Sequence, residues 1–67
     1  MDILINNKTV SIPEDATVTT VLTHANIPAQ RGVAVAVNSN VVPSAEWEQY
    51  KLKENDKVMI IKATQGG

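Results

Sequence analysis

Residues 58–61 constrain the fold more than any other stretch of this chain, because all four are apolar (Val-Met-Ile-Ile). Neighbouring side chains of a strand point to opposite faces of a sheet, so this run is hydrophobic on both faces. Strands of that kind are typical of the centre of a sheet. We therefore expect the final strand of the chain to lie between strands that come earlier in the sequence.

Residues 1–6 and 8–12 each alternate between apolar and polar side chains, as strands with one buried face do. Asn6 and Asn7 stand between them and suit a tight turn, because Asn tolerates positive φ. These features predict a hairpin, and Pro13 ends its second strand because proline has no amide hydrogen to donate.

A second pair of strands is predicted near the middle of the chain. Residues 33–37 alternate Val and Ala, residues 38–40 (Asn-Ser-Asn) form a turn, and residues 41–42 form a short return strand. Residues 44–50 are mostly polar and are expected to form a helical turn or loop, with Trp47 packed against the edge of the core.

One main helix is predicted between the two hairpins. Apolar residues at 18, 21, 22 and 25 have the spacing i, i+3, i+4, i+7 of a helical stripe. Thr17 is a suitable N-cap, Asn26 can adopt the left-handed position after the last turn, and Pro28 prevents continuation. Thr and Val are poor helix formers, so packing must hold this helix.

The order strand, strand, helix, strand, short strand, strand predicts an α+β domain with a mixed four- to five-stranded sheet and the helix on one face. We interpret it as a β-grasp arrangement, in which the first and last strands lie side by side and parallel. Residues 1–62 would form this domain and residues 63–67 a flexible tail. The inner face would carry Ile3, Ile5, Val10, Ile12, Val33, Val35, Val37, Val58 and Ile60.

A single short helix can cover only one face of such a sheet. Leu4, Met59 and Ile61 would then lie on the other face, beside the small Ala34 and Ala36. Exposed apolar patches on small domains often mark partner surfaces, and we favour that interpretation. The alternative is that scattered exposed apolar residues are normal.

The composition excludes several classes of protein. A domain of 67 residues has no room for an enclosed deep pocket, which argues against a self-contained enzyme. Six basic and seven acidic residues do not make the basic face of a nucleic-acid binder. Cysteine is absent, no apolar run could span a bilayer, and residues 1–5 do not resemble a signal peptide. We expect a soluble cytoplasmic protein.

The hydrophobic pattern stops after the final strand, and Ala63, Thr64 and Gln65 lead to Gly66-Gly67. Random sequences end in Gly-Gly only about 0.5% of the time, although chain ends are commonly flexible. If extended, residues 63–67 would reach about 17 Å beyond the sheet, enough to enter a partner's active site. Glycine at the last two positions would let the tail pass through a narrow channel and leave its carbonyl accessible.

Together these residues resemble the ThiS family, the small ubiquitin-like sulfur carriers of thiamine biosynthesis. The resemblance depends on Val35-Ala36-Val37-Asn38, Val42-Pro43, Trp47, Asn55-Asp56, Ala63 and Gly66-Gly67. Two positions depart from the family pattern. Ser44 stands where a basic residue is frequent, and Asn55 stands where glycine is usual. Asn also accepts positive φ, so we expect that turn to form.

The resemblance implies a carrier that binds no cofactor itself. A ThiF-type adenylyltransferase would use ATP and magnesium to adenylate the Gly67 carboxylate. A sulfur donor enzyme would then form a thiocarboxylate, and the thiazole synthase ThiG would take the sulfur. Gly66 and Gly67 would be the modified end of the chain. The residues expected to contact partners are Leu4, Met59 and Ile61 on the exposed face and Ala63, Thr64 and Gln65 in the tail.

Three alternatives remain open from the sequence. A MoaD-type carrier for molybdopterin synthesis shares the fold and tail, although this chain is shorter and has the Pro-to-Trp stretch. A ubiquitin-like modifier would be joined to lysines through Gly67. An inert β-grasp interaction module would not need its glycines.

The remaining polar residues have simpler explanations. His24 has no obvious metal-binding companions and is expected on the surface of the helix. Pairs of acidic residues could suggest acid–base catalysis, but they lie in polar segments and are expected to be solvated. These pairs are Glu46 with Glu48 and Glu54 with Asp56.

Overall fold

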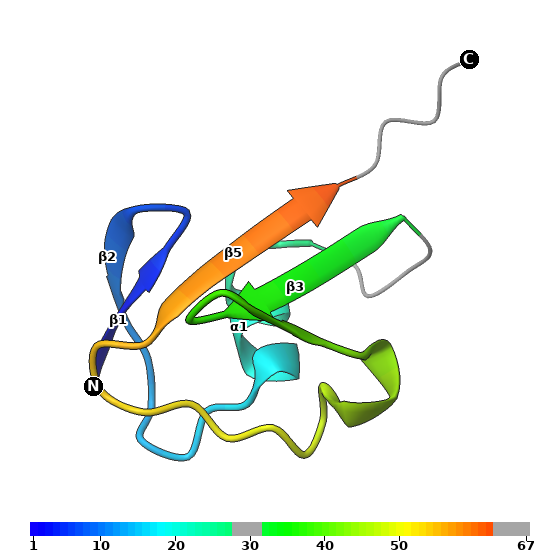
Figure 1. Ribbon diagram of the computed structural model, residues 1–67. Coiled ribbons are helices and arrows are strands. Elements are labelled where there is room, and N and C mark those ends of the chain that lie inside the picture. The colour runs from blue at the N-terminus through cyan, green and yellow to red at the C-terminus, as the bar shows by residue number, and fades with distance from the viewer. Residues whose placement is uncertain (28–31, 63–67) are drawn as a thin grey trace.

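The computed structural model describes residues 1–27 and 32–62, which form a five-stranded mixed sheet with one α-helix (Figure 1). The elements are β1 (Asp2–Ile5), β2 (Lys8–Ser11), α1 (Val18–His24), β3 (Val33–Val37), β4 (Asn40–Val42), a short 3-10 helix η1 (Ser44–Glu46), and β5 (Lys57–Lys62). Both predicted hairpins, the predicted helix and the helical turn before Trp47 are present. The predicted α+β class is confirmed.

The strands lie in the order β2-β1-β5-β3-β4, which places β5 at the centre of the sheet. β5 runs parallel to β1, with Leu4 opposite Lys57 and Ile5 opposite Val58. It runs antiparallel to β3, with residues 58–62 opposite residues 37–33. The central position predicted for the final strand is confirmed, because both of its faces carry apolar side chains and both of its edges are paired.

Each hairpin has a two-residue turn whose central residues have positive φ. These angles are 49° at Asn6 and 71° at Asn7 in the first turn, and 50° at Asn38 and 74° at Ser39 in the second. Such turns have the twist that matches the flanking strands, and asparagine is among the residues that accept them most readily. The turns fix the registers of both hairpins.

Local side-chain and main-chain contacts set both ends of α1. The Thr17 hydroxyl accepts from the backbone N–H of Thr20, and the Thr20 hydroxyl accepts from the backbone N–H of Thr17. At the other end Asn26 has a φ of 59°, and the N–H of Ile27 donates to the Leu22 carbonyl at 2.9 Å. The helix thus begins and ends where the sequence predicts, and Ile27 packs against the core.

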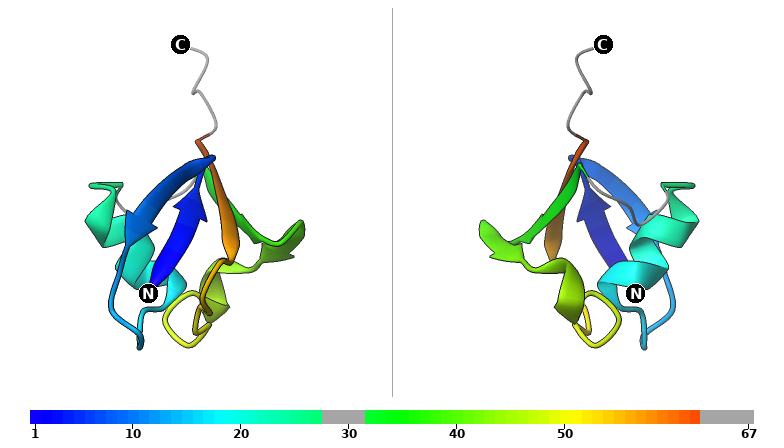
Figure 2. Two further views of the ribbon diagram at one scale, coloured as in Figure 1. Left: turned by 90° about the vertical axis from the view of Figure 1, so that its left-hand side faces the viewer. Right: turned by 90° about the vertical axis from the view of Figure 1, so that its right-hand side faces the viewer.

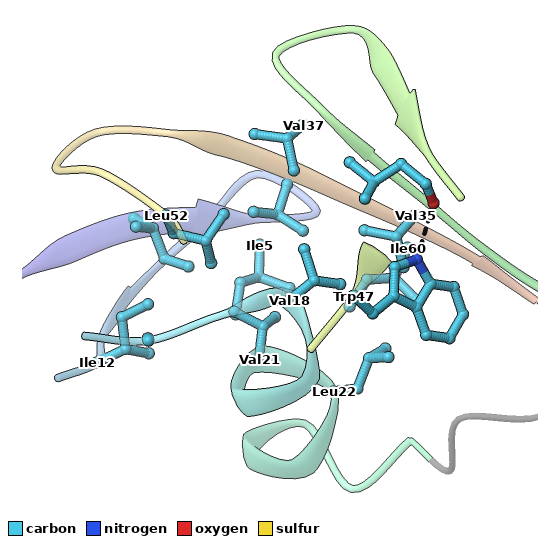
Figure 3. Packing of buried hydrophobic residues seen from close by; sticks show 14 residues of the cluster. Ile5, Ile12, Val18, Val21, Leu22, Val35, Val37, Trp47, Leu52 and Ile60 are labelled. Atoms are coloured by element: carbon cyan, nitrogen blue, oxygen red, sulfur yellow. Dashed lines mark hydrogen bonds between the residues drawn. The ribbon is translucent and has the colours of Figure 1, made fainter. Parts of the chain in front are cut away.

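α1 lies behind β3 and β5 in the view of Figure 1, and Figure 2 shows it to one side of the sheet. The inward side chains of the strands meet the stripe of α1 in one core (Figure 3). Val10 and Val33, which we expected inside, are only partly buried at its margin. The buried apolar residues are Ile3, Ile5, Ile12, Ala16, Val18, Val21, Leu22, Val35, Val37, Val42, Trp47, Leu52, Val58 and Ile60.

Trp47 packs at the edge of the core next to β4. Its indole Nε1 donates a 2.8 Å hydrogen bond to the carbonyl oxygen of Val42, drawn as a dashed line in Figure 3. Pro43 and η1 turn the chain between these two residues, and the N–H of Glu46 donates to the Pro43 carbonyl. The large apolar ring is therefore buried with its polar group satisfied, as predicted for the core edge.

Candidate functional site

The sheet face opposite α1 carries the apolar side chains that the sequence predicted for it. Met59 is 44% exposed and Ile61 is 57% exposed, so neither belongs to the core. Register places Ala36 opposite Met59 and Ala34 opposite Ile61. Because the alanines are small, they leave much of the Met59 and Ile61 side chains uncovered. Within the described residues no helix covers this face.

Val41 extends this surface to the edge of the sheet. It lies opposite Ala36 on β4 and is 73% exposed, the highest exposure of any large apolar side chain in the described residues. A row of three apolar residues thus crosses β4, β3 and β5. We call the surface formed by Val41, Ala36, Met59, Ala34 and Ile61 the outer apolar face.

Two of its features differ from the sequence prediction. Leu4 faces outward as expected, but it is partly buried between Thr9 on β2 and Lys57 on β5, so it borders the outer apolar face. Val41 was not among the predicted contact residues. The signal for it was available, because a two-residue turn at residues 38–39 places residue 41 opposite residue 36 and therefore on the same face.

Two asparagine side chains hold β5 from opposite sides. Asn38 Oδ1 accepts from the N–H of Lys57 at 3.0 Å, at the beginning of the strand. Asn6 Oδ1 accepts from the N–H of Ile60 at 2.8 Å, and Asn6 Nδ2 donates to the Ile60 carbonyl at 3.3 Å. Each asparagine comes from a hairpin turn, so the turn residues also fix the strand that leads toward residues 63–67.

The prediction that Asp56 is solvated is wrong. Asp56 is only 9% exposed, and its carboxylate accepts from the N–H of Lys53 at 2.7 Å and from Asn38 Nδ2 at 3.0 Å. These bonds compensate the carboxylate for lost water, which makes its burial possible. Asp56 has a structural role here and is not part of an acid–base pair. The other three acidic residues of the predicted pairs are exposed, namely Glu46, Glu48 and Glu54.

His24 is exposed in the last turn of α1, as expected. Among residues 1–27 and 32–62, no three His, Cys, Asp or Glu side chains gather in a way that could hold a metal ion. The helix in this part of the chain is also too short to cross a membrane.

β5 ends at Lys62, which lies opposite Val33 at the start of β3. Ile61, the outermost β5 residue of the outer apolar face, directly precedes it. The remaining predicted site residues lie outside the described residues: Ala63, Thr64, Gln65, Gly66 and Gly67. The candidate site therefore consists of the outer apolar face together with the end of the strand from which those five residues continue.

A family model describes the same stretch of sequence that builds this site. The model of the ThiS family matches residues 3–67. This chain belongs to the ThiS family. The family predicted from the motifs is confirmed.

One curated relative and two solved structures of a second protein are similar to this chain. The "Sulfur carrier protein ThiS" of Escherichia coli (strain K12) is 28% identical over 67 residues, and the match covers 100% of both chains. The crystal structure of the thiamine biosynthesis protein ThiS from Geobacter metallireducens has a TM-score of 0.82 at 23% identity and covers 100% of each chain. An NMR structure of a thiamine biosynthesis protein from the same organism has a TM-score of 0.81 at 27% identity, covering 100% of this chain and 88% of the other. The β-grasp fold is thereby confirmed.

The structure explains the two positions at which this ThiS family member departs from the family pattern. Asn55 has a φ of 69°, so asparagine forms the turn before β5 that glycine usually forms. Its N–H donates to the Asp2 carbonyl at 2.8 Å, which ties the turn to β1. Ser44 is exposed at the start of η1, and its carbonyl accepts from the N–H of Trp47. The side chain at position 44 is thus free to vary without a cost to the fold.

Proposed function

We propose that this chain is a sulfur carrier for the synthesis of the thiamine thiazole in the cytoplasm. The Gly67 carboxylate would be adenylated by a ThiF-type partner and converted to a thiocarboxylate, whose sulfur would pass to a ThiG-type thiazole synthase. The observation that supports this most strongly is the match of the ThiS family model through residue 67. The chemistry that we propose uses a folded domain together with paired glycines, and the sequence has Gly66-Gly67 after the described domain.

The chemistry of a carboxylate explains why partners are required. A carboxylate oxygen is a poor leaving group, so direct substitution by sulfur is slow. Attack of the Gly67 carboxylate on the α-phosphorus of ATP would release pyrophosphate and leave an acyl adenylate. Sulfur supplied by the donor at the oxidation level of sulfide would then attack the carbonyl carbon and expel AMP. ATP and magnesium belong to the activating partner in this proposal.

The outer apolar face fits the docking step of this proposal. Met59 and Ile61 lie on the same strand that leads to Gly67, so a partner bound to this face would have the strand end beside its active site. Burial of such side chains contributes roughly 25 cal/mol for each Å² of apolar surface removed from water. A small face of this kind suits complexes that form and dissociate, as a carrier that visits several partners needs.

The test is incubation of the protein with ATP, magnesium and a ThiF-type adenylyltransferase from the same source, followed by intact-mass analysis. We expect the full chain to gain the mass of one adenylyl group, and we expect a variant that lacks Gly66-Gly67 to gain nothing. Adenylation of neither chain would contradict the proposal. Complementation of a thiamine auxotroph, with a molybdenum-cofactor auxotroph in parallel, separates the ThiS role from the MoaD-type alternative.

A further inference from the structure

We propose that Asn6 is a positioning residue, which fixes the direction in which the chain leaves the sheet after Lys62 and so aligns Gly67 with a partner's active site. This inference rests on the proposed function, because alignment matters only if the end of the chain reacts. Asn6 would then have two roles. It forms the turn between β1 and β2, and it also affects the reaction at Gly67.

The main chain of β1 stops following β5 at Asn6. Leu4 and Ile5 pair with Lys57 and Val58, and the N–H of Asn6 still donates to the Val58 carbonyl at 2.9 Å. The φ of 49° at Asn6 then turns the chain into β2. The backbone of β1 therefore supports β5 only as far as Val58.

Beyond Val58, the Asn6 side chain takes over the hydrogen bonding to β5 from the β1 backbone. Its amide offers an acceptor to the Ile60 N–H and a donor to the Ile60 carbonyl, at 2.8 and 3.3 Å. A residue of a neighbouring strand would offer the same two groups. The amide thus replaces the next strand residue and carries the β1 side of β5 two residues further, to within two residues of Lys62.

Support from both sides restrains the orientation of the strand end. On its other side β5 pairs with β3, where Ala36 lies opposite Met59 and Ala34 opposite Ile61. Without the Asn6 amide, residues 59–62 would be paired by β3 alone and would twist more freely. A less restrained strand end would leave the sheet over a wider range of directions, and fewer of these would place Gly67 in a partner's active site.

Asn7 provides a matched control for the turn itself. It also has positive φ, 71°, and it lies beside Asn6 in the same two-residue turn. Within the described residues its side chain makes no hydrogen bond to β5, whereas that of Asn6 makes two. Glycine adopts positive φ without strain, so Asn6→Gly and Asn7→Gly both preserve the turn, but only the first removes the contact to β5.

The experiment compares these two variants with the unsubstituted protein in steady-state adenylation by the activating enzyme. The outer apolar face is intact in both, so KM for the carrier should not change. We expect kcat to fall on the order of tenfold to a hundredfold for Asn6→Gly, in the range that misplacement by about 1 Å costs, and to remain unchanged for Asn7→Gly. Circular dichroism at the assay temperature establishes that each variant is folded.

A measurement without the partner accompanies the kinetics. Backbone ¹⁵N order parameters of Ile61 and Lys62 should fall in Asn6→Gly and not in Asn7→Gly. If Asn6→Gly does not fold, Asn6→Asp is the substitute, because it retains the acceptor for the Ile60 N–H but loses the donor.

Equal kcat and equal order parameters in the two variants would overturn the inference, and so would a loss of rate that only follows the unfolded fraction. If the unsubstituted protein is not adenylated at all, the proposed function fails instead, and the order parameters still decide whether Asn6 fixes the end of β5.

Discussion

The side-chain amide of Asn38 donates a 3.0 Å hydrogen bond to the buried carboxylate of Asp56, and so joins the β3–β4 turn to the residue before β5. The same amide group accepts from the N–H of Lys57, and the N–H of Asn38 donates to the Lys57 carbonyl at 2.8 Å. Asp56 in turn accepts from the N–H of Lys53, while its carbonyl accepts from the N–H of Leu4 at 2.9 Å. This network connects β1, the β3–β4 turn and β5 at the point where the central strand begins.

Substitution of Asp56 should destabilise the domain in a graded manner. The carboxylate accepts from the backbone N–H of Lys53 and from Asn38 Nδ2, so Asp56→Ala removes the acceptor of two donors and should cost about 2–4 kcal/mol of unfolding free energy. Asp56→Asn keeps one acceptor and should cost less. Urea denaturation measures both variants, with Glu54→Ala as the exposed neighbouring control. Equal stability of Asp56→Ala and Glu54→Ala would contradict the role assigned to the network.

Replacement of Trp47 by phenylalanine tests the contact that explains the spacing of Val42 and Trp47. Phe fills most of the same volume but cannot donate to the Val42 carbonyl, which would lose a buried partner. We expect a loss of about 1–3 kcal/mol, or a fall in Tm of roughly 4–8 °C for each kcal/mol. Tyr50→Phe is the control, because it removes a polar group from a half-buried aromatic side chain. A Tm for Trp47→Phe equal to that of the control would show that the indole hydrogen bond contributes nothing.

The outer apolar face should affect partner binding without affecting stability. Met59→Gln combined with Ile61→Thr removes exposed apolar surface, so thermal unfolding should change little. Its KM or Kd for the activating partner should rise at least tenfold, since burying each side chain contributes up to about 1.5–3 kcal/mol. Thr23→Gln, exposed on α1, is the control. Unchanged binding in the double variant would exclude this face as the docking surface.

Substitution of Gly66 by valine tests whether the end of the chain must be free of side chains. The β-carbon and its branches would crowd a narrow channel and the carbonyl that reacts, so adenylation should fall steeply. Docking through the outer apolar face should persist, and competition by Gly66→Val against the unsubstituted carrier measures it. Gln65→Ala is the control one position earlier. Full activity of Gly66→Val would mean that the paired glycines are not required.

The sequence was sufficient to predict the fold because several local signals agreed. The run at 58–61, apolar on both faces, predicted a central strand, and residues 6–7 and 38–40 predicted turns. Both turns are present, although Asn40 belongs to β4. Thr17 and Asn26 set the two ends of α1. Each signal involves residues close together in the chain, and none depends on knowing which distant segments meet.

What the sequence did not reveal depends on contacts between distant segments. Asp56 looked like a surface charge because it stands in a polar segment. Its burial also needs Asn38, which lies 18 positions away in the sequence, in addition to the local bond from the Lys53 N–H. Asn6 was predicted as a turn residue, while its bonds to Ile60 cross 54 positions of sequence. A side-chain amide that bonds to a distant strand produces no periodic pattern in the sequence. The sequence therefore predicted that Asn6 and Asn38 form turns but did not predict their bonds to β5.

The most direct test of the central claim is the intact mass of the protein purified from its native cells under conditions that preserve thiocarboxylates. The account predicts a fraction heavier by the difference between one sulfur and one oxygen atom, with fragmentation placing the change on Gly67. That fraction should disappear when the activating enzyme is deleted. A chain that carries only the ordinary carboxylate, even with the activating enzyme and a sulfur donor present, would contradict the proposal that it carries sulfur.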